Sequence, residues 1–132
     1  MKVEEVHIKD WVNISDEMGN IAPFRVNSVQ CGDVAAENYI TVSDFFNPFY
    51  EGEFQPIPIT ADILKKNGFT VRSFPLDTIC IWEEDKNKIM WSETMVSMRQ
   101  WDSCKSYQGS IKYVHELQQA IRLCGIDKDI IL

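Results

Sequence analysis

In the first half of the chain, apolar residues alternate with polar ones in short runs that turn residues separate. Three such runs, at residues 6–14, 24–29 and 39–42, predict strands. The first run has a break at Lys9-Asp10, and turns are expected at residues 16–20 and 30–33. Strands this short, with turns roughly 10–12 residues apart, are typical of a small β-barrel or a curled antiparallel sheet.

The junction at residues 43–60 holds Pro48, Pro56 and Pro58, which prevent a helix and disfavour a central strand. It also holds a dense group of aromatic residues, so it does not have the composition of a flexible linker. Two interpretations stay open. The aromatics pack the junction onto the sheet, or some of them stay exposed as a patch that binds a partner. The candidate binding residues in this segment are Phe46, Phe49 and Tyr50.

A short helix is predicted at residues 60–67. Thr60 can cap its N-terminus through the side-chain hydroxyl. Gly68 suits the left-handed position that follows a helix, and Phe69 would then cover Leu64.

The second half predicts an antiparallel meander. Strands are expected at 78–82 and 88–91 around a charged loop at 83–87, then at 94–101, with an edge strand within 71–76. We expect Trp82, Trp91 and Trp101 to lie in the core, the alternative being that they stack on a base or a sugar ring. Residues 102–109 are expected to form a polar loop. A final helix is predicted at 111–124, capped by Ser110.

The apolar residues of that final helix fall on one face. They are Val114, Leu117, Ile121 and Cys124, whose spacing of three and four residues marks the face that packs inward. The polar residues, which include His115, Gln118 and Gln119, are expected on a solvated face. A second interpretation makes Tyr113, His115 and Gln119 a strip that binds a ligand. The apolar tail at 126–132 is expected to pack back on the protein or to contact another subunit.

Together these patterns predict an α+β fold. A small N-terminal β-barrel or curled antiparallel sheet is followed by a helix, an antiparallel β-meander and a C-terminal helix. We expect an acidic β-rich subdomain at 1–54 and an α+β subdomain at 55–132, or alternatively one compact unit.

The charge is unevenly distributed between the two halves. The chain has 132 residues and a net charge of −7. Residues 1–60 hold three basic and ten acidic residues, whereas residues 61–132 hold ten of each. Because nucleic-acid binding depends on Lys and Arg neutralising phosphates, the sequence argues against such binding by residues 1–60. An acidic surface fits a basic protein partner, although it can equally serve solubility alone.

Binding by the second half stays open. It would require Lys65, Lys66, Arg72, Lys88, Arg99 and Lys105 to cluster on one face.

The sequence carries little recognisable catalytic chemistry. Cysteines stand at 31, 80, 104 and 124 without a C-x-x-C pair, so neither a zinc site nor another metal site is predicted, and we expect no cofactor. Cys80 and Cys124 are expected to be buried, which leaves Cys104 as the candidate exposed thiol. As a nucleophile Cys104 would need a base, and the chain offers His7 and His115.

Three segments together resemble a known group of proteins. They are residues 1–13, residues 55–69 (QPIPIT leading to ILKKNGF) and residues 111–118 (IKYVHELQ). They resemble, in the same order, a family of uncharacterised small proteins common in phages, prophages and mobile elements of anaerobic gut bacteria. That family carries PIPLTEEILLKCGF-like and KYVHQLQNLYFALTG-like motifs. The resemblance implies a phage-associated protein with a β-rich part followed by an α+β part, and it implies no activity.

From these observations we expect a non-enzymatic interaction or accessory protein. We expect a cytoplasmic location, since no apolar secretory segment opens the chain and no run is long enough to span a membrane. A protein partner, which the charge suggests is basic, or a second copy of the chain would be bound. The alternative is a small enzyme or ligand-binding domain with a cleft between the halves that uses Cys104 or His115.

Overall fold

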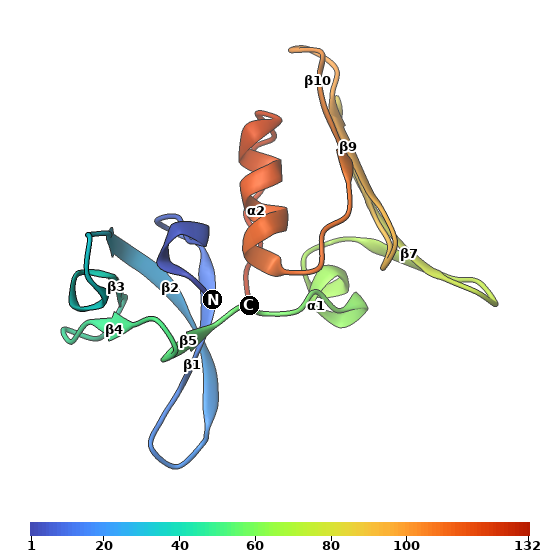
Figure 1. Cartoon of the computed structure of the whole chain (residues 1–132). Helices are drawn as coiled ribbons and strands as arrows, with labels where there is room; N and C mark the ends of the chain where they lie inside the picture. The colour runs from blue at the N-terminus through green and yellow to red at the C-terminus, as the bar shows by residue number, and fades with distance from the viewer. The chain divides into compact units, whose positions relative to one another are not determined.

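A computed structural model describes all residues from Met1 to Leu132 and shows an α+β fold (Figure 1). The chain divides into two compact units, Met1–Ile57 and Pro58–Leu132, each with its own antiparallel sheet. The division falls after Ile57 instead of after residue 54. Strand β5 (Phe54–Gln55) pairs with β1 (Trp11–Ser15), so it belongs to the first unit.

The first unit is a curled five-stranded sheet in the order β4-β3-β2-β1-β5. Its longest strand is β2 (Ile21–Gln30), and the others not yet named are β3 (Tyr39–Val42) and β4 (Phe49–Tyr50). Short 3-10 turns occur at Val3–Glu5 and Ala35–Glu37. The register of β2 on β3 shifts between Val26 and Ser28, and such a bulge increases the local twist and bending of a strand. The sequence therefore predicted the curled sheet correctly.

Apolar residues at alternate positions of these strands form the core of the first unit. Its buried members are Val3, Val6, Val12, Ile14, Val26, Ile40, Val42 and Phe54, with Met1, Phe24, Val29 and Phe49 packed against them. The break expected at Lys9-Asp10 is present, since Lys9 has a φ of 73°. Residues before the break do not form a strand, and β1 begins at Trp11.

The second unit contains both helices and a five-stranded meander in the order β10-β9-β8-β7-β6. Helix α1 spans Ala61–Lys66 and helix α2 spans Val114–Leu123. The strands are β6 (Thr70–Ser73), β7 (Thr78–Glu84), β8 (Asn87–Trp91), β9 (Val96–Gln100) and β10 (Lys105–Gly109).

Three expectations for the second unit are wrong. The hairpin expected around residues 83–87 is present, but the predicted five-residue loop is wrong, because β7 and β8 continue to Glu84 and Asn87 and leave a two-residue turn. Residues 105–109, expected in a polar loop, form the edge strand β10. Helix α2 begins at Val114 rather than residue 111, because the Glu116 carboxylate accepts the backbone N–H of Tyr113 at 3.1 Å and replaces Ser110 as the capping group.

The two helices end in the same way. Gly68 (φ 86°) follows α1, where Phe69 N–H bonds to Leu64 C=O at 3.0 Å and Gly68 N–H to Lys65 C=O at 3.2 Å. Gly125 (φ 69°) follows α2 with the equivalent pair of bonds from Ile126 and Gly125. Both are Schellman endings, in which the residue after the glycine covers the last turn. The predicted cap of α1 is confirmed, since Thr60 Oγ1 accepts the N–H of Ile63 at 3.2 Å.

The C-terminal tail packs back on the second unit through two side-chain amides. Gln118 donates to Lys128 C=O at 3.1 Å and accepts from Ile130 N–H at 2.7 Å. Asn67 makes the same kind of pair with the backbone of Ile131, at 2.9 and 2.8 Å. The expectation that the tail packs back is confirmed.

The second sheet has two different faces. Strand residues of one parity are buried toward α2, namely Cys80, Trp82, Ile89, Trp91, Val96 and Met98. Trp91 joins this layer to the segment that precedes α2 by donating its indole N–H to Ile111 C=O at 3.0 Å. Residues of the other parity lie on the face away from α2, which we call the open face (Figure 1). No helix of the structure is long and apolar enough to cross a membrane.

Candidate functional site

The aromatic residues of the junction form a cluster on the first unit. Phe24 of β2 meets Phe45 with ring centroids 5.1 Å apart, and Phe45 meets Phe49 of β4 at 6.1 Å, both edge to face. Phe24 and Phe49 also pack against the core of this unit. Strand pairing therefore fixes two rings of the cluster on the sheet, and Phe45 extends it outward.

Two of the three junction residues predicted to bind a partner are accessible. Phe46, in the loop between β3 and β4, is fully exposed, whereas Phe49 is partly buried against the core. Tyr50 is exposed over about a third of its surface (38%) and lies edge to face with Tyr39 at 5.8 Å. Each open interpretation therefore holds for part of the segment: Phe49 packs inward, and Phe46 projects outward.

The segment also contains three carboxylates, two of which have a structural role. Glu51 accepts the backbone N–H of Val3 at 2.8 Å, and Glu53 accepts that of Tyr50 at 3.2 Å. Asp44, with a φ of 71°, turns the chain ahead of Phe45 and is exposed. We call the exposed group Asp44, Phe45, Phe46, Tyr50 and Glu53 the acidic aromatic edge.

The three candidate residues on the final helix differ in their surroundings. Tyr113 is partly exposed and its ring stacks on that of His115, with centroids 5.9 Å apart and planes 17° from parallel. His115 is buried, as is Gln118, so the expectation of a solvated face is wrong for both. Gln118 is buried because it holds the C-terminal tail. Gln119 is half-buried.

The cysteines give no support to a nucleophilic site. Cys80 and Cys124 are buried as predicted, and burial raises the pKa of both thiols, which disfavours the reactive thiolate. Cys104 is exposed as predicted, and its Sγ lies 3.7 Å from Trp101 C=O. Cys31 is exposed too, which the sequence did not indicate. The structure contains no group of three or more acidic, histidine or cysteine side chains that could hold a metal ion.

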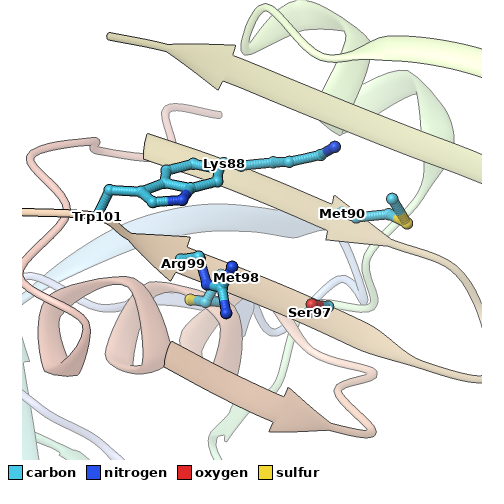
Figure 2. A pocket seen from close by; sticks show the side chains of 6 residues that line it. All are labelled: Lys88, Met90, Ser97, Met98, Arg99 and Trp101. Atoms are coloured by element: carbon cyan, nitrogen blue, oxygen red, sulfur yellow. The ribbon is translucent and has the colours of Figure 1, made fainter. Parts of the chain in front are cut away.

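The open face of the second sheet carries Arg72, Lys88 and Arg99, three of the six cations whose clustering the sequence analysis left open. Lys88 and Met90 of β8 and Ser97 and Arg99 of β9 line a hollow of about 260 Å³ there, together with Trp101 and strand residue Met98 (Figure 2). Trp101 is 46% exposed, so its expected place in the core is wrong. The signal was present in the sequence, because Trp101 has the opposite phase to the buried Val96 and Met98.

Comparison of the chain with models of protein families, with curated proteins and with solved structures gives no match.

Proposed function

We propose that this protein works without catalysis, as an interaction protein whose acidic aromatic edge binds a basic segment of another protein. The observation that supports this most directly is the fully exposed ring of Phe46. It lies in the loop between the paired strands β3 and β4, one residue after Phe45, whose ring contacts those of Phe24 and Phe49. A partner that covers such a ring gains roughly 1.5–3 kcal/mol from its burial.

The charge of the first unit determines the kind of partner. Residues 1–57 hold three basic and ten acidic residues, a net charge of −7. Such a field attracts a segment rich in Lys and Arg and speeds its association, and salt weakens both effects. The acidic charge of the unit and the exposed Phe46 ring therefore favour a basic segment that also carries an apolar side chain.

The resemblance noted in the sequence supports a biological setting for this interaction. We propose that the protein is a cytoplasmic accessory protein of phage or mobile-element origin. The alternative, a small enzyme that uses Cys104 or His115, has less support, because the Cys104 thiol donates to the Trp101 carbonyl at 3.7 Å and His115 is buried.

A binding assay with a defined probe tests the proposal. A short fluorescein-labelled peptide of alternating lysine and leucine is titrated with the full chain, and anisotropy reports the dissociation constant. Phe46→Ala should weaken binding by about tenfold, as expected for an aromatic anchor. Phe74→Ala is the matched control, since Phe74 is exposed in the second unit, and it should leave the affinity unchanged.

Two outcomes would overturn the proposal. The first is equal affinity of the Phe46→Ala variant and the original chain. The second is a peptide that shows no binding even at about 50 mM salt, where attraction between exposed charges is strong.

A further inference from the structure

We propose that the open face of the second sheet binds single-stranded nucleic acid, with a base stacked on Trp101 and phosphates on Arg99, Lys88 and Arg72. This inference is independent of the proposed function, because it concerns the other unit and a partner of opposite charge. It rests on the arrangement of cations, on the exposed indole and on the hollows between them.

The cations of the open face come from three strands. Arg72 lies on β6, Lys88 on β8 and Arg99 on β9, and the last two stand directly opposite each other. Glu83 is the single acid among the strand residues of this face, and it pairs with Lys88 at 3.6 Å. Arg72 and Arg99 form no ion pair, so their charge is available to a phosphate. A unit with no net charge thus presents a locally basic surface.

The six cations named in the sequence analysis do not all cluster on one face, and only Arg72, Lys88 and Arg99 share the open face. Lys105 has the parity of the buried side of the sheet, and its charge acts on Cys124 at the end of α2. Lys65 and Lys66 belong to α1. These two lysines of α1 provide the control for the experiment below.

Trp101 is held in place at the edge of this surface. Its backbone N–H bonds to Lys86 C=O at 3.0 Å, and the adjacent Asp102 pairs with the Lys86 ammonium at 2.7 Å. The Arg99 guanidinium lies 5.7 Å from the centroid of the indole ring. An exposed aromatic ring beside a cation is the combination on which bases stack in proteins that bind single strands.

Adjoining hollows define a path across the face. The hollow of about 260 Å³ in Figure 2 shares Lys88 with a second of about 330 Å³, which is lined by Gly68, Thr70, Arg72, Ile81, Glu83 and Lys88. From the strand spacing and rise, the backbones of Lys88 and Arg72 are roughly 16 Å apart. That span suits a site of about four nucleotides, the small end of the range for single-strand binding domains.

The acidic turn between β7 and β8 gives the path a direction. A third hollow next to Trp101 is lined by Glu83, Glu84, Asp85, Lys86 and Asn87, and the carboxylates of Glu84 and Asp85 in the turn repel phosphate. A bound strand therefore runs from Trp101 toward Lys88 and Arg72, away from that turn.

The indole favours a single strand over the other polyanions. A duplex keeps the faces of its bases stacked on one another, so Trp101 would have nothing to stack on. An acidic peptide would use the three cations but gain little from a flat aromatic ring. Single-stranded nucleic acid uses both features.

The experiment measures binding of fluorescein-labelled oligothymidylate of about ten nucleotides to the full chain by anisotropy. We expect a dissociation constant between about 10⁻⁶ and 10⁻⁴ M at about 50 mM salt, weakening as salt is raised. The double variant Lys88→Gln/Arg99→Gln should bind at least about tenfold more weakly. Trp101→Leu, which keeps an apolar side chain, should bind about fivefold more weakly or worse.

Lys65→Gln/Lys66→Gln removes the same charge elsewhere in the unit and should change the affinity less than about twofold. Circular dichroism melting of each variant verifies that it is folded. The inference is overturned if this control weakens binding as much as Lys88→Gln/Arg99→Gln, or if oligothymidylate does not bind. It is also overturned if a labelled polyglutamate of equal charge binds as tightly, since the surface would then serve an acidic protein segment.

Discussion

The two units of this chain carry their charge in different ways, although each is built on a five-stranded antiparallel sheet. The first unit has ten acids against three bases and is acidic overall. The second has ten of each, but its bases Arg72, Lys88 and Arg99 share one sheet face with a single acid. The comparison shows that the net charge of a unit can conceal a charged face. The charged face becomes apparent once alternate residues of each strand are assigned to opposite faces of the sheet.

Each unit also has buried side chains of its own, so a substitution can destabilise one unit and not the other. Phe54 is fully buried in the sheet of the first unit, and Leu117 is fully buried on α2 of the second. Phe54→Ala should cost about 3–5 kcal/mol and Leu117→Ala about 2–5 kcal/mol of unfolding free energy. Hydrogen exchange should show the loss of protection concentrated in the unit that carries the substitution.

Leu76→Ala is the control for these variants, because Leu76 is almost fully exposed and its removal should change protection little. Equal loss of protection in both units from either core variant would contradict the division at Ile57.

A second prediction concerns Gly68, the residue that ends helix α1 in the second unit. The first unit contains no α-helix. Its φ of 86° suits glycine, and asparagine tolerates that region better than β-branched residues do. Gly68→Val should therefore cost at least about 1–2 kcal/mol, whereas Gly68→Asn should cost clearly less. A Cβ atom added at Gly68 would lie 3.8 Å from the Trp82 side chain, which is an ordinary contact distance. The expected loss of stability therefore comes from the backbone conformation and not from crowding. Thermal melting that shows equal stability for the two variants would refute the assigned ending.

The smallest expected effect is a pH dependence at the β1–β2 turn of the first unit. The Asp16 carboxylate accepts N–H groups from Met18 and Asn20, and the bonds from Asn20 hold the pKa of Asp16 below 3.8. Because the folded pKa is lower than the unfolded one, the turn is stabilised above pH 3.8, and this is lost as the pH falls through the folded value.

Carboxyl NMR titration of Asp16 should give a midpoint below 3.8. Asp16→Asn should reduce the acid sensitivity of this turn in hydrogen exchange. A midpoint at or above 3.8, or an unchanged acid sensitivity, would show that the turn bonds do not favour the ionised form.

The sequence predicted those parts of the fold that local patterns determine. Gly68 after an apolar helix face specified the end of α1, and alternation specified the curled sheet. Strand β10 was missed because a polar edge strand such as residues 105–109 has the composition of a loop. The sequence predicts Gln118 on a solvated face, but its side-chain amide is buried against backbone groups of the C-terminal tail. The helix pattern alone does not show that the tail lies there.

The candidate sites were predictable to different degrees. The many aromatic residues around Phe46 identified this segment as a candidate from the sequence. Only the strand pairing shows that Phe46 is exposed whereas Phe49 packs against the core. The open face could not be found from charge counts, since the bases and acids of the second unit cancel. It becomes visible when the register places Lys88 opposite Arg99.

One measurement tests most directly the claim that the two units bind partners of opposite charge. The ¹⁵N-labelled full chain is titrated with oligothymidylate and, in a second sample, with the lysine–leucine peptide, and amide and indole shifts are followed by NMR. We predict that oligothymidylate shifts β8, β9 and the Trp101 indole, whereas the peptide shifts residues 44–53. Shifts at the same residues with both probes, or with oligothymidylate on the first unit, would contradict the account.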